Sequence, residues 1–179
     1  MTTILPAPGG VQFAGRYVPT VIRGSAPDQV AIRPAAGQEL DRLRDIAADG
    51  KRYWGYDPDL VEQWLALADF SPELFAAKHV FVAVAGGEIV AWSSLILKGD
   101  VCWLDDLWVA PHWIRRGVGT TLFDHAVNYA RSAGASVMEW EAEPLAVAFY
   151  EKMGGRRVRE SEPSAIWNRT IPVVALTLE

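Results

Sequence analysis

The sequence predicts a mixed α/β domain built on one twisted, mostly antiparallel sheet that is flanked by helices. Half of the 179 residues are hydrophobic, which is enough for a single core. Apolar runs joined by short glycine-containing turns predict neighbouring antiparallel strands in the first half of the chain. In the second half, segments of helical periodicity alternate with strand-like runs, which predicts a βαβ unit beside that meander.

The N-terminal segment differs in composition from the remainder of the chain. Residues 1–29 hold four of the eleven prolines and four of the fifteen glycines, and are expected to form an irregular extension, with an extra strand as a weaker alternative. Residues 30–179 are expected to form the globular domain. It opens with a strand over "VAIRP" and a helix whose apolar face carries Leu40, Leu43, Ile46 and Ala47.

A second helix and three strands are expected next. Asp57 is placed to cap the helix, and Pro58 suits its first position. "VFVAV" and "EIVAWSSLILK" flank Gly86-Gly87, a pair typical of a two-residue hairpin turn. Gly99-Asp100 then leads into a third strand, "VCWLDDLWV".

After Pro111 the apolar spacing becomes helical, and Gly134 is placed to end this helix. The strand "ASVMEWEAE" and the short helix "LAVAFYEKM" follow, and Gly154-Gly155 close that helix. Two further strands are expected, the last over "IPVVALTLE". The expected order is therefore β, α, α, β, β, β, α, β, α, β, β.

Charge and composition exclude several classes of function. Acidic residues outnumber Lys and Arg by 22 to 17, so a nucleic-acid partner is not expected. The single cysteine, Cys102, favours a buried thiol in a reducing, cytoplasmic protein, and no apolar run suggests a membrane partner. His79, His112 and His125 lack metal-ligand spacing, so no metal is expected. An apolar last strand and eight tryptophans would permit a homodimer.

The stretch "LWVAPHWIRRGVGTTLF" carries the strongest local signal. A glycine-bearing loop at a helix N-terminus exposes backbone amides where phosphate oxygens bind, and Arg115 and Arg116 add positive charge there. A tight turn with two solvated arginines is the alternative. The P-loop pattern G-x-x-x-x-G-K-[ST] is absent, and the dinucleotide pattern G-x-G-x-x-G fails because Leu122 takes the place of its third glycine.

This stretch, with "AVAFYEKMGG" further on, resembles the two central motifs of the GNAT family of acyl-CoA-dependent N-acyltransferases. The matching residues are Val109, Pro111, Gly117, Gly119, Phe149, Tyr150 and Gly154. Three positions depart from the family pattern, namely Ile114, Leu145 and Gly155. The resemblance extends over residues 30–179 and implies a GNAT-like fold.

The resemblance also implies a cofactor site. Acetyl-CoA would lay its pyrophosphate on the amides of residues 114–120 and its pantetheine arm along the strand ending at residues 107–109. The residues concerned are Leu107, Trp108, Val109, Ile114, Arg115, Arg116, Gly117, Val118, Gly119 and Thr120. Tyr150 matches the family tyrosine and is the candidate acid that protonates the departing sulfur, the alternative being a packed aromatic residue.

Carboxylates and aromatic residues supply candidates for the acceptor side. Asp105 and Asp106 interrupt an apolar strand, and Glu139, Glu141 and Glu143 would share one face of theirs. Asp105 and Glu141 are the preferred base candidates, with surface ion pairs as the alternative. Tyr53, Trp54 and Tyr56, with Asp106, are expected to line the pocket of a cationic or aromatic amine, or else to be core packing.

The resulting hypothesis is an N-acetyltransferase that moves an acetyl group from acetyl-CoA to a primary amine of a small molecule or peptide. A non-catalytic acyl-CoA-binding regulatory domain is the alternative of a different class. A third reading keeps the enzyme but gives it a longer acyl chain or an alcohol acceptor.

Overall fold

The computed structural model describes residues 20–21, 30–163 and 168–179. One sheet of eight strands has the order β1-β2-β3-β4-β5-β6-β8-β7. Its strands are β1 (Thr20–Val21), β2 (Val30–Pro34), β3 (His79–Ala85), β4 (Glu88–Lys98), β5 (Val101–Val109), β6 (Val137–Glu141), β7 (Arg156–Glu160) and β8 (Pro172–Thr177). Apart from β1, the predicted irregular extension over residues 1–29 lies outside the described residues.

Within the described residues, five α-helices and three short 3-10 helices accompany the sheet. The α-helices are α1 (Leu40–Tyr53), α2 (Pro58–Leu67), α3 (Pro72–Ala76), α4 (Val118–Ser132) and α5 (Val147–Lys152), and the 3-10 helices are η2 (Gly37–Glu39), η3 (Pro111–Trp113) and η4 (Pro144–Ala146). The order of elements matches the prediction except for β1 and α3. None of the helices in these described ranges is long and apolar enough to cross a membrane.

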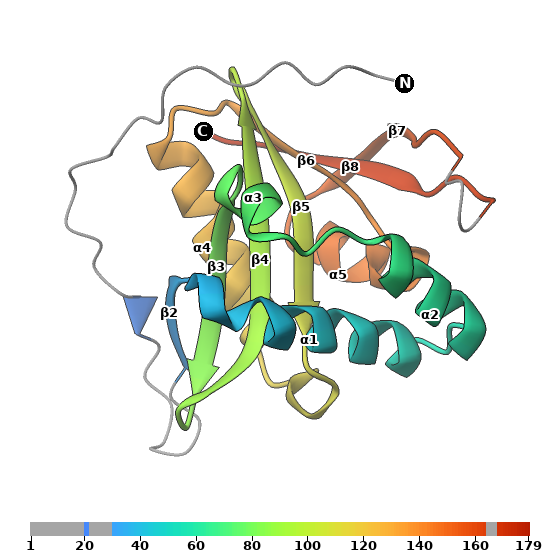
Figure 1. Ribbon diagram of the computed structural model, residues 1–179. Coiled ribbons are helices and arrows are strands. Elements are labelled where there is room, and N and C mark those ends of the chain that lie inside the picture. Colours follow the sequence, from blue (N-terminus) through green and yellow to red (C-terminus); the bar gives the residue numbers. More distant parts are fainter. Residues whose placement is uncertain (1–19, 22–29, 164–167) are drawn as a thin grey trace.

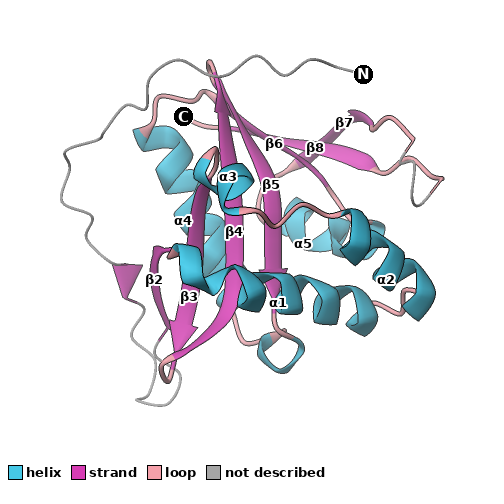
Figure 2. Cartoon of the chain, viewed as in Figure 1, coloured by secondary structure: helices cyan, strands magenta, loops and turns pink. Residues whose placement is uncertain are grey.

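The helices form two layers, one on each face of the sheet (Figure 1). α1 crosses in front of β3, β4 and β5, and α3 lies in front of β4, whereas α2 lies to the right of β5 and α4 lies behind β3 and β4 (Figure 2). Alternation along β3 separates the two cores, since Val82 packs with α1 and Phe81 and Ala83 pack with α4. The predicted apolar face of α1 is buried, which confirms that helix.

The predicted meander and βαβ unit are both present. Gly86 and Gly87 have φ angles of 57° and 86°, the left-handed values that a two-residue hairpin turn between β3 and β4 requires. β5 pairs antiparallel with β4 and parallel with β6, and α4 makes the crossover. Asp57 caps α2 as predicted, because its carboxylate accepts from the amides of Asp59 at 2.8 Å and Leu60 at 3.4 Å.

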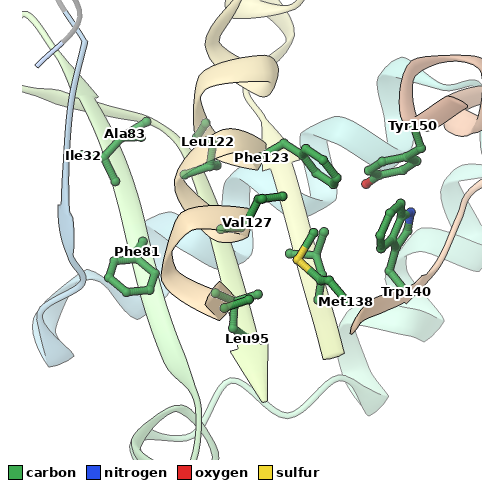
Figure 3. Packing of buried hydrophobic residues seen from close by; sticks show 14 of the residues in the cluster. Ile32, Phe81, Ala83, Leu95, Leu122, Phe123, Val127, Met138, Trp140 and Tyr150 are labelled. Atoms are coloured by element: carbon green, nitrogen blue, oxygen red, sulfur yellow. The ribbon is translucent and has the colours of Figure 1, made fainter. Parts of the chain in front are cut away.

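Aromatic residues fill the core where α4 and α5 meet β6 (Figure 3). Trp140 is 1% exposed and its ring lies 5.0 Å from that of Tyr150 and 5.3 Å from that of Phe123. Gly155 permits this packing, since a Cβ there would lie 2.7 Å from Val174 and 3.0 Å from Trp140. The large side chain of Trp140 therefore occupies the volume beside the glycine that departs from the family pattern.

Gly155→Ala should reduce the free energy of unfolding by about 2 kcal/mol, because the added methyl group has no space between Val174 and Trp140. Urea denaturation followed by fluorescence would measure the change. Gly37→Ala is the matched control, since nothing lies within 4 Å of a Cβ at that position. Equal stability of the two variants would contradict this account of the packing.

Candidate active site

A cavity of about 380 Å³ opens where β5 and β6 separate. Its walls come from the end of α1, the second half of β5, the N-terminus of α4, the end of β6 and α5. The cavity therefore reaches elements from both helical layers. Its lining includes Gly50, Trp54, Tyr56, Leu104, Asp105, Asp106, Leu107, Trp108, Val109, Trp113, Ile114, Arg115, Gly117, Gly119, Thr120, Trp140, Glu141, Glu143, Leu145, Ala146, Phe149 and Tyr150.

The N-terminus of α4 forms one end of the cavity. Gly117 caps the helix with a φ of 81°, a left-handed value that glycine adopts at little cost. The amide of Thr121 donates to the carbonyl of Gly117 at 3.0 Å, so the amides of residues 118–120 precede the helical bonds and are available to an anion. The amides of Ile114 and Arg116 instead donate to loop carbonyls, at 3.2 and 3.4 Å.

The two arginines beside this end are not equivalent. Arg115 lines the cavity and has a φ of 65°, an uncommon value for a residue with a side chain. Arg116 is outside the lining, and its guanidinium lies over the Trp113 ring at 5.3 Å from the centroid. Val118, also predicted at the cofactor site, has its side chain in the core, where it is 2% exposed.

The edge of β5 that faces β6 is only partly paired. The pairs Val101–Val137, Cys102–Met138 and Trp103–Glu139 join the two strands, and the pairing ends there. Beyond this point β5 continues to Val109 along the cavity. In the described part of the chain no strand pairs with this edge from residue 104 onward, so an extended ligand could hydrogen-bond to it.

A β-bulge brings two neighbouring acids to the same cavity. Ser94 pairs with Asp106 and Leu95 pairs with Leu104, which leaves Asp105 as the extra residue of β5. In a regular strand, adjacent side chains point to opposite faces, whereas a bulge redirects them. Both Asp105 and Asp106 consequently line the cavity.

These two aspartates already have partners. Asp105 forms an ion pair with Lys78 at 2.5 Å, and the same ammonium lies 3.8 Å from Asp106. Asp106 accepts hydrogen bonds from the Ser94 hydroxyl at 2.7 Å and the Trp108 indole at 3.1 Å. Burial, reinforced by the charge of Asp105, raises the pKa of Asp106 above its ordinary value.

Glu141 differs from the other carboxylates of the lining. No hydrogen bond or ion pair joins its side-chain carboxylate to another residue in the described ranges, whereas its neighbour on the same face, Glu139, pairs with Arg159 at 2.8 Å. Burial and the charge of Asp105 raise the pKa of Glu141 above its ordinary value, which makes the carboxylate a better proton acceptor.

Tyr150 closes the cavity from α5. The residue is 7% exposed, and burial together with the charge of Asp106 raises the pKa of its phenol. The phenol therefore keeps its proton at neutral pH. Its hydroxyl makes no hydrogen bond to the described residues, so the proton is not committed to another group of the chain.

The predicted aromatic residues separate into two groups. Trp54 and Tyr56 line the cavity, while Tyr53 is 49% exposed and its ring centroid lies 5.4 Å from that of Trp54 in a T-shaped arrangement. Tyr56 donates a hydrogen bond to Glu143 and accepts one from Arg169. The prediction that Glu143 shares a strand face with Glu139 and Glu141 is wrong, because β6 ends at Glu141 and Glu143 precedes η4.

In the ranges that the structure describes, no three His, Cys, Asp or Glu side chains are grouped as a metal site would need. Sequence reasoning missed Lys51, Lys78 and Arg169, the cations beside this cavity. Lys51 follows the buried residues Leu43 and Ala47 of α1 at the same four-residue spacing, and this spacing could have indicated that Lys51 is buried. Lys78 and Arg169 had no such signal, because tertiary contacts alone bring them to the site.

Comparison with known proteins gives concordant findings. The model of the Acetyltransferase (GNAT) family matches residues 40–155. An uncharacterized N-acetyltransferase of Methanocaldococcus jannaschii is 31% identical over 83 residues, which are 45% of this chain and 35% of that protein. The match thus spans about a third of the relative's length.

Solved structures show the same fold. The PaiA N-acetyltransferase of Thermoplasma acidophilum, in complex with coenzyme A, superposes with a TM-score of 0.71 at 16% identity, over 83% of this chain and 98% of that one. A GCN5-related N-acetyltransferase of Rhodopseudomonas palustris gives a TM-score of 0.72 at 24% identity, over 92% and 100% of the two chains.

Proposed function

Because this chain belongs to the GNAT family of acetyltransferases, we propose that it transfers the acetyl group of acetyl-CoA to a primary amine of a small molecule or peptide. One observation carries the proposal: a single cavity joins the N-terminus of α4, the unpaired edge of β5, and the carboxylate of Glu141. These are respectively a site for phosphate, a site for an extended arm, and a proton acceptor.

Acetyl-CoA fits the groups that the chain presents. The amides of residues 118–120 and the guanidinium of Arg115 would hold the pyrophosphate, with the dipole of α4 adding to the attraction. The unpaired edge from Leu107 to Val109 would hydrogen-bond the pantetheine arm. Acetyl-CoA supplies an activated thioester, and the chain's residues bind and orient it.

The acceptor must reach the thioester as a neutral amine. Glu141 would remove its proton, directly or through a water molecule, because its carboxylate is unpaired within the described ranges and its pKa is raised. Asp105 is the weaker candidate, since Lys78 already neutralises its charge. Backbone amides near residues 107–109 would stabilise the oxyanion that forms as nitrogen attacks the carbonyl carbon.

Collapse of that intermediate breaks the carbon–sulfur bond, and the sulfur then needs a proton. Tyr150 would supply it, because its buried phenol is protonated at neutral pH and its hydroxyl is uncommitted among the described residues. Trp54, Tyr56 and Asp106 would line the acceptor side, where aromatic walls and a carboxylate suit a cationic amine.

Titration of tryptophan fluorescence with acetyl-CoA, CoA, NADH and ATP tests the cofactor, since Trp108 and Trp113 line the cavity. Saturable quenching by the two CoA compounds alone is the expected result. Release of CoA thiol in the presence of a panel of primary amines then tests transfer. If acetyl-CoA binds but no amine in the panel is acetylated, the alternative of a non-catalytic acyl-CoA-binding domain would be favoured.

Arg115→Gln should weaken acetyl-CoA binding by about tenfold, because it removes a charge that lines the phosphate end of the cavity. Arg116→Gln is the matched control and should change the dissociation constant much less, since Arg116 lies over Trp113 outside the lining. The same titration measures both variants. Equal losses would mean that the two arginines act only through their general positive charge.

A further inference from the structure

Lys51 is the one charged residue that is buried in the described part of the chain. It lies in the last turn of α1, directly after Gly50, and is 7% exposed. Burial of an ammonium is costly unless nearby groups compensate for the lost hydration. Its surroundings therefore indicate what the residue does.

Three aromatic rings surround the ammonium, and we call them the aromatic cage. The Nζ atom lies 4.5 Å from the centroid of Trp64, 5.0 Å from that of Trp108 and 5.2 Å from that of Tyr56. All three distances are within the range in which a cation is attracted to a ring face. Two of these rings, Tyr56 and Trp108, line the cavity.

Charged groups face Lys51 from the neighbouring elements. Asp106 on β5 and Glu143 between β6 and η4 attract its charge, whereas Arg169 before β8 opposes it. The two carboxylates also bind rings of the cage, since the Trp108 indole donates to Asp106 and the Tyr56 hydroxyl donates to Glu143. The rings, the two carboxylates and Lys51 thus form one connected cluster.

We propose that Lys51 is a positioning residue of the acceptor site: its ammonium holds the Tyr56 and Trp108 rings in place, next to the carboxylates of Asp106 and Glu143 to which those rings are hydrogen-bonded. This inference rests on the proposed acetyl transfer, because it assumes that the amine packs against those rings. Lys51 lies behind the lining of the cavity, so it acts through the cage and not by contact with the acceptor.

The position of Lys51 also makes its charge sensitive to pH near neutrality. Burial lowers its pKa to about 8, with Arg169 acting in the same direction and Glu143 and Asp106 against it. Above that pH the residue becomes neutral, so the cage loses its cation and the two carboxylates lose a compensating charge. Acceptor binding should weaken over the same interval.

The test compares Lys51→Met with the wild-type chain across pH 6.5 to 9.5. At pH 7 the variant should raise the acceptor KM by about tenfold, with kcat at saturation and the dissociation constant of acetyl-CoA little changed. The ratio of wild-type to variant kcat/KM cancels the titration of the acceptor itself. That ratio should fall through a midpoint near pH 8, where Lys51 loses its proton.

Lys98→Met is the matched control, because Lys98 also lies over a tryptophan, Trp103, at 5.4 Å but outside the cavity lining. Its ratio should stay flat with pH. Lys51→Arg should keep the low acceptor KM at pH 9, since arginine does not titrate there. An acceptor KM that Lys51→Met leaves unchanged at pH 7 would overturn the positioning role.

A second measurement follows Lys51 in the wild-type chain and does not require Lys51→Met to fold. The chain has only four lysines, so ¹³Cε-lysine labelling gives few signals in a correlation spectrum, and the spectrum of Lys51→Arg assigns the signal of Lys51. We expect its midpoint near pH 8 and a shift on addition of a productive acceptor. A Lys51 signal that does not shift on addition of a productive acceptor would refute the inference, whereas an absence of acetyl transfer would refute the proposed function alone.

Discussion

Tyr150→Phe should lower kcat by about two orders of magnitude while the dissociation constant of acetyl-CoA stays within about twofold. A departing thiolate requires a proton donor. The buried phenol of Tyr150 keeps its proton because its pKa is raised, so it can act as that donor. Phenylalanine preserves the ring that packs at 5.0 Å from Trp140 and removes only the oxygen. Steady-state thiol release and fluorescence titration measure the two constants.

The stability of the same variant is the internal control. Because the Tyr150 hydroxyl has no hydrogen-bond partner among the described residues, its removal should leave the melting temperature nearly unchanged. A matched variant, Tyr129→Phe, removes a hydroxyl that bonds His79 at 2.7 Å and lies outside the cavity lining. Turnover that survives in Tyr150→Phe would exclude the phenol as the acid.

Glu141→Gln should reduce kcat/KM for the acceptor by about 100-fold, because the amide keeps the shape of the carboxylate and cannot accept the amine's proton. The effect should depend on pH. Burial and the charge of Asp105 raise the pKa of Glu141, so the wild-type rate should fall as pH drops through that raised value and the base becomes protonated. The variant should lack this acidic limb.

Glu139→Gln is the matched control for Glu141→Gln. It distinguishes the loss of a specific proton acceptor from a general effect of removing a negative charge. Glu139 lies two residues earlier on the same face of β6, is paired with Arg159 at 2.8 Å, and does not line the cavity. Its pH–rate profile should therefore match the wild type. If both glutamine variants lost activity equally, the carboxylates would act by binding the ammonium and not as bases.

Periodicity predicts most of this fold because each main element is long enough to repeat its pattern. Helix α4, for example, repeats its apolar spacing over 15 residues, and the strands of the meander are bounded by turn glycines. Helix α3 has five residues, too few for a helical period, and only its N-terminus carries a signal, the capping residue Ser71 followed by Pro72. The sequence indicates that α2 ends before this segment, but it does not distinguish a loop from a single helical turn over Pro72–Ala76.

The site was predicted less completely, because tertiary contacts decide which candidates face the cavity. The bulge at Asp105 depends on the register between β4 and β5, which adjacent residues do not reveal. Ion pairing also decides between carboxylates that look alike in the sequence, as Glu139 and Glu141 do. Lys51 was overlooked since a lysine is usually exposed, although it continues the buried stripe of α1.

The short pairing between β5 and β6 has a consequence for how the molecule opens. Eight residue pairs join β4 to β5, whereas three join β5 to β6. The strands β6, β8 and β7 are therefore expected to behave as a separate cooperative unit that unfolds at a lower free energy than β3 to β5. Amide hydrogen exchange should be faster in β6 and β8 than in β3 and β4. A ligand that bridges the separated strands would slow exchange on both sides and merge the two units into one.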